Sequence, residues 1–265
     1  MNSESKPRLA ASSYLNTAPL IWSFKYGSRK DYVSLVDAVP SLCADLLAGR
    51  EVDCALVPSI EYQRIDDAKL IPGVCVGSRE KVRSVVLVSR LNNLKKVRSV
   101  ALDDSSRTSV ALVRIIFKEF LQFEPEWTTR SPDLKQMLRN SDAALIIGDP
   151  AMKFARDGLR VWDMAALWHD FTGLGFVFAL WMAGTTSGAT PAIDFVQACN
   201  EGLAQRNEII DYYEQSLALP RSELETYLTK NITFFLDDHL LKGLEFYYEL
   251  AYKHGLVPGL KPLNL

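Results

Sequence analysis

Short apolar runs alternate with helical patterns twice along this chain, and the alternation constrains the fold more than any other feature. Strands that alternate with helices form βαβ units around parallel sheets, so the pattern predicts an α/β protein. After residues 184–188 the pattern changes to helices only. The strand-like runs lie at 8–13, 32–38, 53–57 and 70–76, and then at 84–89, 99–102, 143–147 and 176–182.

Prolines, glycines and capping residues mark the expected helix boundaries. Pro19 and Pro40 each suit the first turn of a helix, and Gly49 suits the end of the second one. Ser59 is expected to begin a helix directly after a strand. Three further helix starts are expected: at Thr190 with Pro191, at a capping box over residues 222–225, and at Asp237 or Asp238.

The strand-rich stretches at 84–89 and 176–182 are expected to carry the chain between two lobes. Lobe one then comprises residues 1–86 with 179–265, and lobe two comprises residues 87–178. A chain of 265 residues is long enough for two such units. Two lobes joined by two crossings form a hinged cleft, and a ligand is expected to bind in that cleft.

The formal net charge of −2 gives the chain no overall basic field that would attract nucleic acid or a membrane surface. An anionic ligand must therefore be attracted locally, by helix N-termini, hydroxyls and arginines. Residues 1–8 lack the apolar core of a signal peptide, and the apolar run at 173–184 is too short to cross a bilayer. These features favour a cytoplasmic protein and leave its oligomeric state open.

No motif for a metal or a cofactor occurs in the sequence. The cysteines lie in apolar runs, form no CxxC pair and have no histidine close by, which is typical of buried free thiols. P-loop, GxGxxG and Ser-His-Asp patterns are absent. His169 is a candidate acid–base group, but a single histidine is a weak signal. The cysteines are Cys43, Cys54, Cys75 and Cys199, and the other histidines are His239 and His254, in the C-terminal helices.

Ligands of parallel sheets bind beyond the carboxyl ends of the strands, which directs attention to the loops there. Asn16 follows the first strand, and its amide both donates and accepts hydrogen bonds. Asn16 or Thr17 would equally cap the helix at Pro19. Ser59 stands at a helix N-terminus, where backbone amides attract anions, although a plain N-cap also explains it. Ser84, at the first crossing, faces either a ligand or solvent.

The loop at residues 103–109 carries the strongest binding chemistry. Ser106, Thr108 and Ser109 supply hydroxyls and Arg107 a guanidinium at the start of a helix, which together suit a carboxylate. A helix cap needs only one hydroxyl, so the surplus favours binding.

The loop at residues 147–150 is a further candidate. Gly148 lets the backbone approach a ligand closely. Asp149 is either a base or the cap of the next helix, and the cap is favoured.

Five motifs in register make the sequence recognisable. Together they closely resemble the chorismate dehydratase family of the futalosine route to menaquinone. Gly175 departs from the proline of that family, in a turn away from the presumed chemistry. The motifs are YLNTAPL at 14–20, VPSIEY at 57–62, SRTS at 106–109, IGDP at 147–150 and W-x3-TGL-x-FVFA at 168–179.

The resemblance implies a two-lobed fold like the type 2 periplasmic binding proteins; no cofactor is expected, since the sequence contains no cofactor motif. It also implies that chorismate, a dianion, loses water to give 3-[(1-carboxyvinyl)oxy]benzoate. Asn16 would orient the leaving hydroxyl or the reacting ring, and the base would be the enolpyruvyl carboxylate of the substrate or, failing that, Asp149. One carboxylate would be held by Ser106, Arg107, Thr108 and Ser109, the other by Ser59 and Ser84, with Gly148 and Thr172 as further substrate-binding residues.

Two alternatives remain open at this point. One is a solute-binding protein without catalysis, which would normally carry an export signal. The other is the related enzyme later in the same pathway, which acts on cyclic dehypoxanthine futalosine. For that enzyme a catalytic histidine is expected in the second lobe, and the cleft loops contain no clear counterpart.

Overall fold

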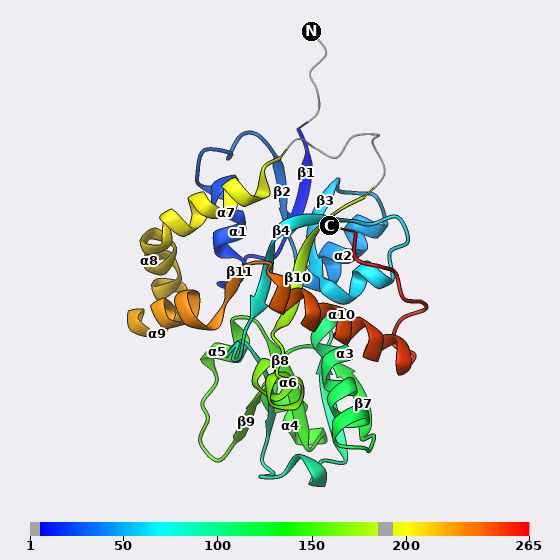
Figure 1. Ribbon diagram of the computed structural model, residues 1–265. Helices are drawn as coiled ribbons and strands as arrows, with labels where there is room; N and C mark the ends of the chain where they lie inside the picture. Colours follow the sequence, from blue (N-terminus) through cyan, green and yellow to red (C-terminus); the bar gives the residue numbers. More distant parts are fainter. Residues whose placement is uncertain (1–5, 185–192, 265) are drawn as a thin grey trace.

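A computed structural model describes residues 6–184 and 193–264 and contains two β-sheets, each with helices packed against it (Figure 1). The first sheet has the strand order β11-β4-β10-β3-β1-β2, in which β1 runs parallel to β2 and β3 while β10 runs antiparallel to β3 and β4. Its strands are β1 (Arg8–Ala11), β2 (Ser34–Asp37), β3 (Cys54–Pro58), β4 (Lys69–Ser78), β10 (Phe176–Ala183) and β11 (Thr233–Phe235).

The second sheet has the order β7-β6-β8-β5-β9, with β6 parallel to β7 and β8, and β5 antiparallel to β8 and β9. The α/β class is confirmed, but both sheets are mixed where the alternation predicted parallel pairing. The strands of this sheet are β5 (Val85–Ser89), β6 (Ser99–Asp103), β7 (Glu126–Arg130), β8 (Ala143–Ile147) and β9 (Arg160–Asp163).

Each half of the molecule consists of one sheet and the helices around it, and α10 lies across the junction between the two halves (Figure 1). The first half contains α1 (Ala18–Lys25), α2 (Pro40–Ala48), the 3-10 helix η1 (Ser59–Gln63), α7 (Phe195–Ala204), α8 (Arg206–Leu217), α9 (Arg221–Thr226) with the π-helical η4 (Tyr227–Asn231), and α10 (Asp238–Lys253). The second contains η2 (Leu94–Lys96), α3 (Thr108–Ile115) with the π-helical η3 (Ile116–Phe120), α4 (Leu134–Asn140), α5 (Pro150–Lys153) and α6 (Met164–Thr172).

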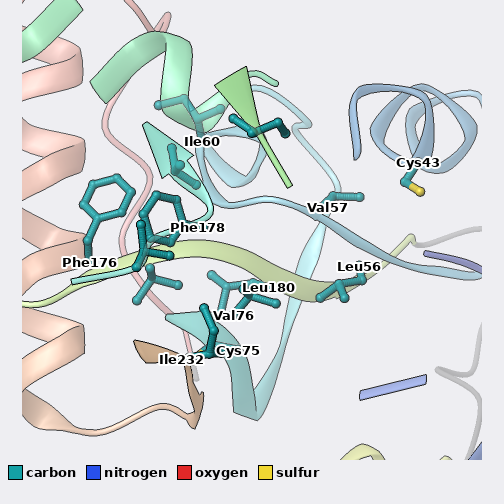
Figure 2. Close-up of a cluster of buried hydrophobic side chains, with 14 of the residues drawn as sticks. Cys43, Leu56, Val57, Ile60, Cys75, Val76, Phe176, Phe178, Leu180 and Ile232 are labelled. Atoms are coloured by element: carbon teal, nitrogen blue, oxygen red, sulfur yellow. The ribbon is translucent and has the colours of Figure 1, made fainter. Parts of the chain in front are cut away.

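The main core follows β10, the strand that brings the chain back to the first sheet. Phe176, Phe178 and Leu180 point from β10 into a buried cluster with Cys75 and Val76 of β4 (Figure 2). Each such apolar side chain stabilises the fold by about 1.5–3 kcal/mol when fully buried. The first sheet is therefore stabilised by a buried apolar cluster between β10 and β4.

The sheets divide the chain close to the expected crossings. β5 pairs with the second sheet from Val85 onward, and β10 pairs with the first sheet from Phe176 onward. We propose two lobes on this division, lobe one containing the first sheet and lobe two the second.

Several helix boundaries agree with the capping signals and others do not. Asp237 caps α10 by accepting a hydrogen bond from the Leu240 amide, as predicted. The capping box over residues 222–225 is wrong, because α9 follows Pro220 and has no side-chain cap. Ser59 begins only a short 3-10 turn. The helix start expected at Thr190 lies outside the described residues, and α7 begins after its cap Asp194.

Candidate functional site

A small cavity of about 50 Å³ lies between the two lobes, and loops of both contribute to its wall. Lobe one supplies the β1–α1 loop and the end of β3, and lobe two supplies the start of α3 and the end of β8. Pockets that hold small ligands usually measure about 300–1,000 Å³, so we propose that the lobes separate to admit a substrate. The polar lining consists of Ser12, Tyr14, Asn16, Thr17, Ser106, Thr108, Ser109 and Gly148.

A larger hollow of about 660 Å³ lies at the surface beside the first crossing. It is lined by Lys81, Arg83, Trp162 and their neighbours and contains none of the residues assigned to substrate. We place the candidate site in the smaller cavity, because there hydroxyls of both lobes converge at strand ends.

Asn16 is a polar residue of the cavity with an unused hydrogen-bond acceptor. Its Oδ1 is buried and has no hydrogen-bond partner in the protein. A buried amide oxygen without a partner costs about 1–3 kcal/mol, so a ligand that donates to it recovers that free energy. The adjacent Thr17 makes no side-chain cap to α1; its Oγ1 donates to the carbonyls of Ser12 and Tyr14 and so fixes the loop.

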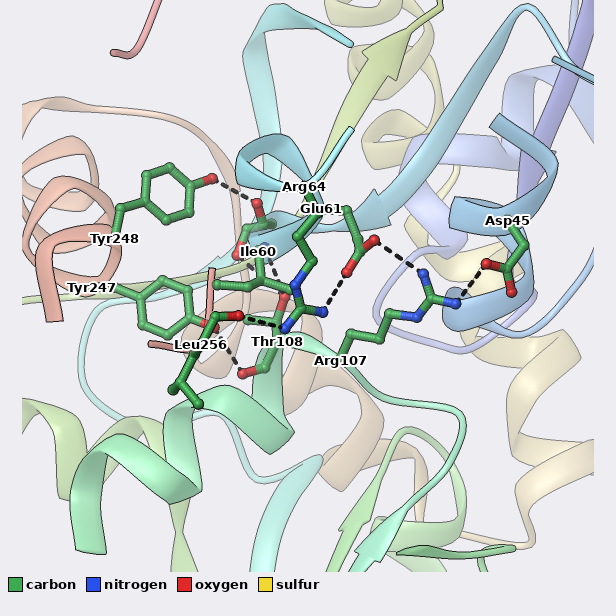
Figure 3. A network of polar contacts seen from close by, with 10 residues as sticks. Asp45, Ile60, Glu61, Arg64, Arg107, Thr108, Tyr247, Tyr248 and Leu256 are labelled. Atoms are coloured by element: carbon green, nitrogen blue, oxygen red, sulfur yellow. Dashed lines mark hydrogen bonds and ion pairs between the residues drawn. The ribbon is translucent and has the colours of Figure 1, made fainter. Parts of the chain in front are cut away.

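The start of α3 forms the opposite wall. Ser106, Thr108 and Ser109 line the cavity there, and the N-terminal end of the helix adds partial positive charge. Thr108 Oγ1 accepts a hydrogen bond of 3.2 Å from the Ile60 amide and lies 3.3 Å from Ser59 Oγ (Figure 3). Three of the four residues predicted in this loop are therefore brought together at the cavity.

Arg107, the fourth, points elsewhere. Its guanidinium forms ion pairs with Glu61 at 3.0 Å and Asp45 at 2.6 Å, both in lobe one (Figure 3). Glu61 is only 4% exposed and is also paired with Arg64 at 2.8 Å. Arg107 does not line the cavity. Through these two ion pairs Arg107 joins the second half of the molecule to the first.

Three more predicted residues do not line the cavity. Ser59 Oγ donates to the Val177 carbonyl at 2.7 Å, and Ser84 Oγ accepts from the Tyr227 hydroxyl at 2.6 Å. Thr172 Oγ1 donates to the Trp168 carbonyl within α6. Substrate contacts of these three side chains stay predictions. The Thr172 hydroxyl is bonded within its own helix and contacts none of the loops that line the cavity.

Gly148 and Asp149 lie where β8 ends. Gly148 has a φ of +64°, and a Cβ there would lie 2.9 Å from the Tyr14 ring, so the close approach of the two loops requires glycine. Asp149 does not cap α5, which was the favoured interpretation. Its Oδ1 instead accepts a hydrogen bond of 3.0 Å from the Leu15 amide of lobe one.

Burial raises two pKa values at this contact. It raises the pKa of Asp149 to about 6, against the lowering effects of the Leu15 amide and Lys153. It also raises the pKa of Tyr14 to about 12, with the Asp103 and Asp149 charges adding to the effect. Tyr14 was not singled out from the sequence, although it stands in the same loop as Asn16.

The pKa of Asp149 predicts a pH dependence of stability. A carboxyl whose folded pKa is raised stabilises the fold below its ordinary value of 3.8, and this stability is lost as the pH rises through about 6. We expect the free energy of unfolding of the wild type, relative to Asp149→Asn, to fall by about 2 kcal/mol between pH 4 and pH 7. Urea denaturation at both pH values measures this difference. Parallel pH profiles of the two proteins would contradict the raised pKa.

The described residues contain no cluster of side chains that could bind a metal ion. Within 6–184 and 193–264, no three His, Cys, Asp or Glu side chains are grouped so as to hold a metal ion. The four cysteines are free and buried. No histidine lines the cavity: His239 contacts the Gly173 carbonyl and His254 pairs with Glu119. No helix in the same described ranges is both long and apolar enough to cross a membrane.

Comparisons with known proteins agree over nearly the whole chain. A family model described as menaquinone biosynthesis matches residues 7–253. The chorismate dehydratase of Thermus thermophilus is 30% identical over 256 residues, which cover 89% of this chain and 92% of that protein. The chorismate dehydratase of Campylobacter jejuni is 28% identical over 264 residues, covering 95% and 96% respectively.

Solved structures support the fold. A protein of Archaeoglobus fulgidus superposes with a TM-score of 0.76 and 16% identity, covering 97% of this chain and all of the other. The periplasmic aliphatic sulphonate binding protein of Escherichia coli superposes with a TM-score of 0.63 and 19% identity, covering 97% of this chain and 90% of the other. These likenesses concern the fold alone, and they confirm the expected periplasmic-binding-protein-like architecture.

Proposed function

This chain belongs to the menaquinone biosynthesis family, and from that membership we propose that it is a chorismate dehydratase, a carbon–oxygen lyase of the futalosine route. The substrate is chorismate, and the products are 3-[(1-carboxyvinyl)oxy]benzoate and water. One observation at the site supports the proposal: Asn16, whose Oδ1 is buried and has no hydrogen-bond partner, lines a cavity with hydroxyls from both lobes. Such a cavity suits a small polyoxygenated anion.

The reaction makes modest demands on the protein. A ring proton and the neighbouring hydroxyl leave together as water, and the electron pair of the C–H bond forms the double bond that makes the ring aromatic. Because aromatisation is strongly favourable, the enzyme mainly orients the substrate and handles one proton. The enolpyruvyl carboxylate of the substrate accepts that proton and passes it to the departing hydroxyl, which leaves as water, and Asn16 orients this hydroxyl.

The carboxylate site combines Ser106, Thr108 and Ser109 with the N-terminus of α3. Hydroxyl donors and the helix dipole stabilise an anion there without a free cation. Arg107 takes the role of holding the lobes together, since its guanidinium is occupied by Glu61 and Asp45. The sequence-based roles of Ser59 and Ser84 at the second carboxylate remain part of the proposal.

A comparison of two substrates tests the reaction against its rivals. We expect purified protein to convert chorismate, detected by mass spectrometry, and to leave cyclic dehypoxanthine futalosine unchanged. Conversion of the latter alone would indicate the later-pathway enzyme. Calorimetric binding of chorismate without conversion would indicate a solute-binding protein, a function that the fold also supports.

A further inference from the structure

The loop that carries Asn16 is held from both lobes. Within lobe one, Thr17 Oγ1 bonds to the Tyr14 carbonyl at 2.8 Å, and the Thr17 amide donates to the same carbonyl at 3.1 Å. These contacts shape the turn but do not reach lobe two. They persist in any position of the hinge, because both partners belong to one short segment.

Lobe two holds the residues immediately before Asn16. Asp149 Oδ1 accepts the Leu15 amide at 3.0 Å, a hydrogen bond between residues 134 positions apart. Next to it, the Tyr14 ring lies so close to Gly148 that a Cβ at position 148 would approach it to 2.9 Å. Both contacts cross between the lobes, so both are lost when the lobes separate.

The Asp149 side chain forms no cap hydrogen bond in its own helix, although it stands at the N-cap position of α5. The carboxylate reaches across the cleft instead and takes the amide next to Asn16. Asn16 itself keeps its Oδ1 free for a ligand. One of the contacts that hold the Asn16 loop therefore comes from lobe two, and it is lost when the lobes separate.

We propose that Asp149 is a positioning residue: through the Leu15 amide it fixes Asn16 for reaction, and only when the lobes close. The inference rests on the proposed function of Asn16. It makes lobe closure a condition for turnover, because in an open cleft the Asn16 loop loses its anchor on lobe two. A hydrogen-bond acceptor at position 149 is then required, and a basic group is not.

Two substitutions at position 149 separate positioning from base catalysis. Asp149→Asn keeps an oxygen that accepts from Leu15 and removes the basic carboxylate, so we expect kcat within about 10-fold of wild type. Asp149→Ala removes the acceptor, and we expect kcat to fall by about 10²-fold with little change in chorismate affinity. Equal inactivity of two folded variants would overturn the proposal and favour Asp149 as the base.

A double-mutant cycle tests the route through Asn16. If Asp149 acts through Asn16, adding Asp149→Ala to Asn16→Ala lowers kcat by no more than about 3-fold beyond Asn16→Ala alone. If the kcat losses of the two single variants multiply in the double variant, the proposal is overturned. Asp133→Ala is the matched control: Asp133 also accepts a backbone amide at 3.0 Å, from Gln136, but within lobe two. It should leave kcat unchanged.

Amide hydrogen exchange tests the contact without any turnover. We expect residues 14–17 to exchange faster in Asp149→Ala than in wild type and Asp149→Asn, and unchanged exchange would overturn the proposal. Should Asp149→Ala fail to fold, Asp149→Ser, which is too short to reach Leu15, replaces it in every arm. A wild type that does not convert chorismate would refute the proposed function. The hydrogen-exchange experiment would still test the contact between Asp149 and Leu15.

Discussion

Asn16→Ala should reduce kcat on chorismate by about 10²–10³-fold, while the dissociation constant of chorismate changes by less than about 10-fold. The asymmetry follows from the site. In the proposed site, hydroxyls and a helix N-terminus on the opposite wall hold the carboxylate, and Asn16, which also lines the cavity, orients the departing hydroxyl. An interaction that strengthens only as the C–O bond breaks contributes to turnover and little to ground-state binding.

The measurement pairs steady-state turnover with calorimetric binding for each variant. Asn93→Ala is the matched control, because Asn93 is an exposed cap of η2 that accepts the Lys95 amide at 2.9 Å. Its kcat and affinity should equal those of wild type. Normal turnover by Asn16→Ala would refute the role of Asn16. An equal loss of affinity and turnover would assign Asn16 to general binding instead.

Gly243→Ala should produce the largest loss of stability. A Cβ at Gly243 would lie 2.0 Å from the Gly175 carbonyl oxygen, a backbone atom that cannot rotate away. Alanine favours a helix by up to about 1 kcal/mol over glycine, so the clash must exceed that gain. We expect a net loss of about 2–3 kcal/mol and a Tm lower by roughly 5–10 °C.

Activity should also suffer in Gly243→Ala, since α10 spans the lobe junction. Tyr247 and Tyr248 of that helix donate to the carbonyls of Thr108 and Ser59, one in each lobe. Gly259→Ala is the control, because a Cβ at Gly259 meets nothing within 4 Å. Calorimetric unfolding measures both variants. Equal Tm values for Gly243→Ala and Gly259→Ala would contradict the close packing of α10.

The sequence predicted the buried strands and one edge strand, β2, but missed the other three edge strands. β3, β5 and β8 are buried along their whole length and appear as continuous apolar runs. β7, β9 and β11 were missed, because they lie at sheet edges and are short or partly exposed. An edge strand needs no apolar run, since only part of its surface meets the core.

The candidate site divides in a similar way. Asn16 and the hydroxyls at 106–109 could be found because they directly follow strands, where ligands of such sheets bind. The pairing of Arg107 with Glu61 and the bond between Ser59 and Val177 join residues 46 and 118 positions apart. Local sequence patterns do not specify such partners. For the same reason the contact of Asp149 with Leu15 could be seen only in the folded chain.

Dehydration of chorismate is tested by one reaction with the protein in excess over chorismate, stopped at intervals and analysed by mass spectrometry. We expect chorismate to disappear in a single turnover and an aromatic product lighter by one water to replace it. Chorismate that binds in the same experiment and is recovered unchanged would refute the dehydratase function and indicate a binding protein.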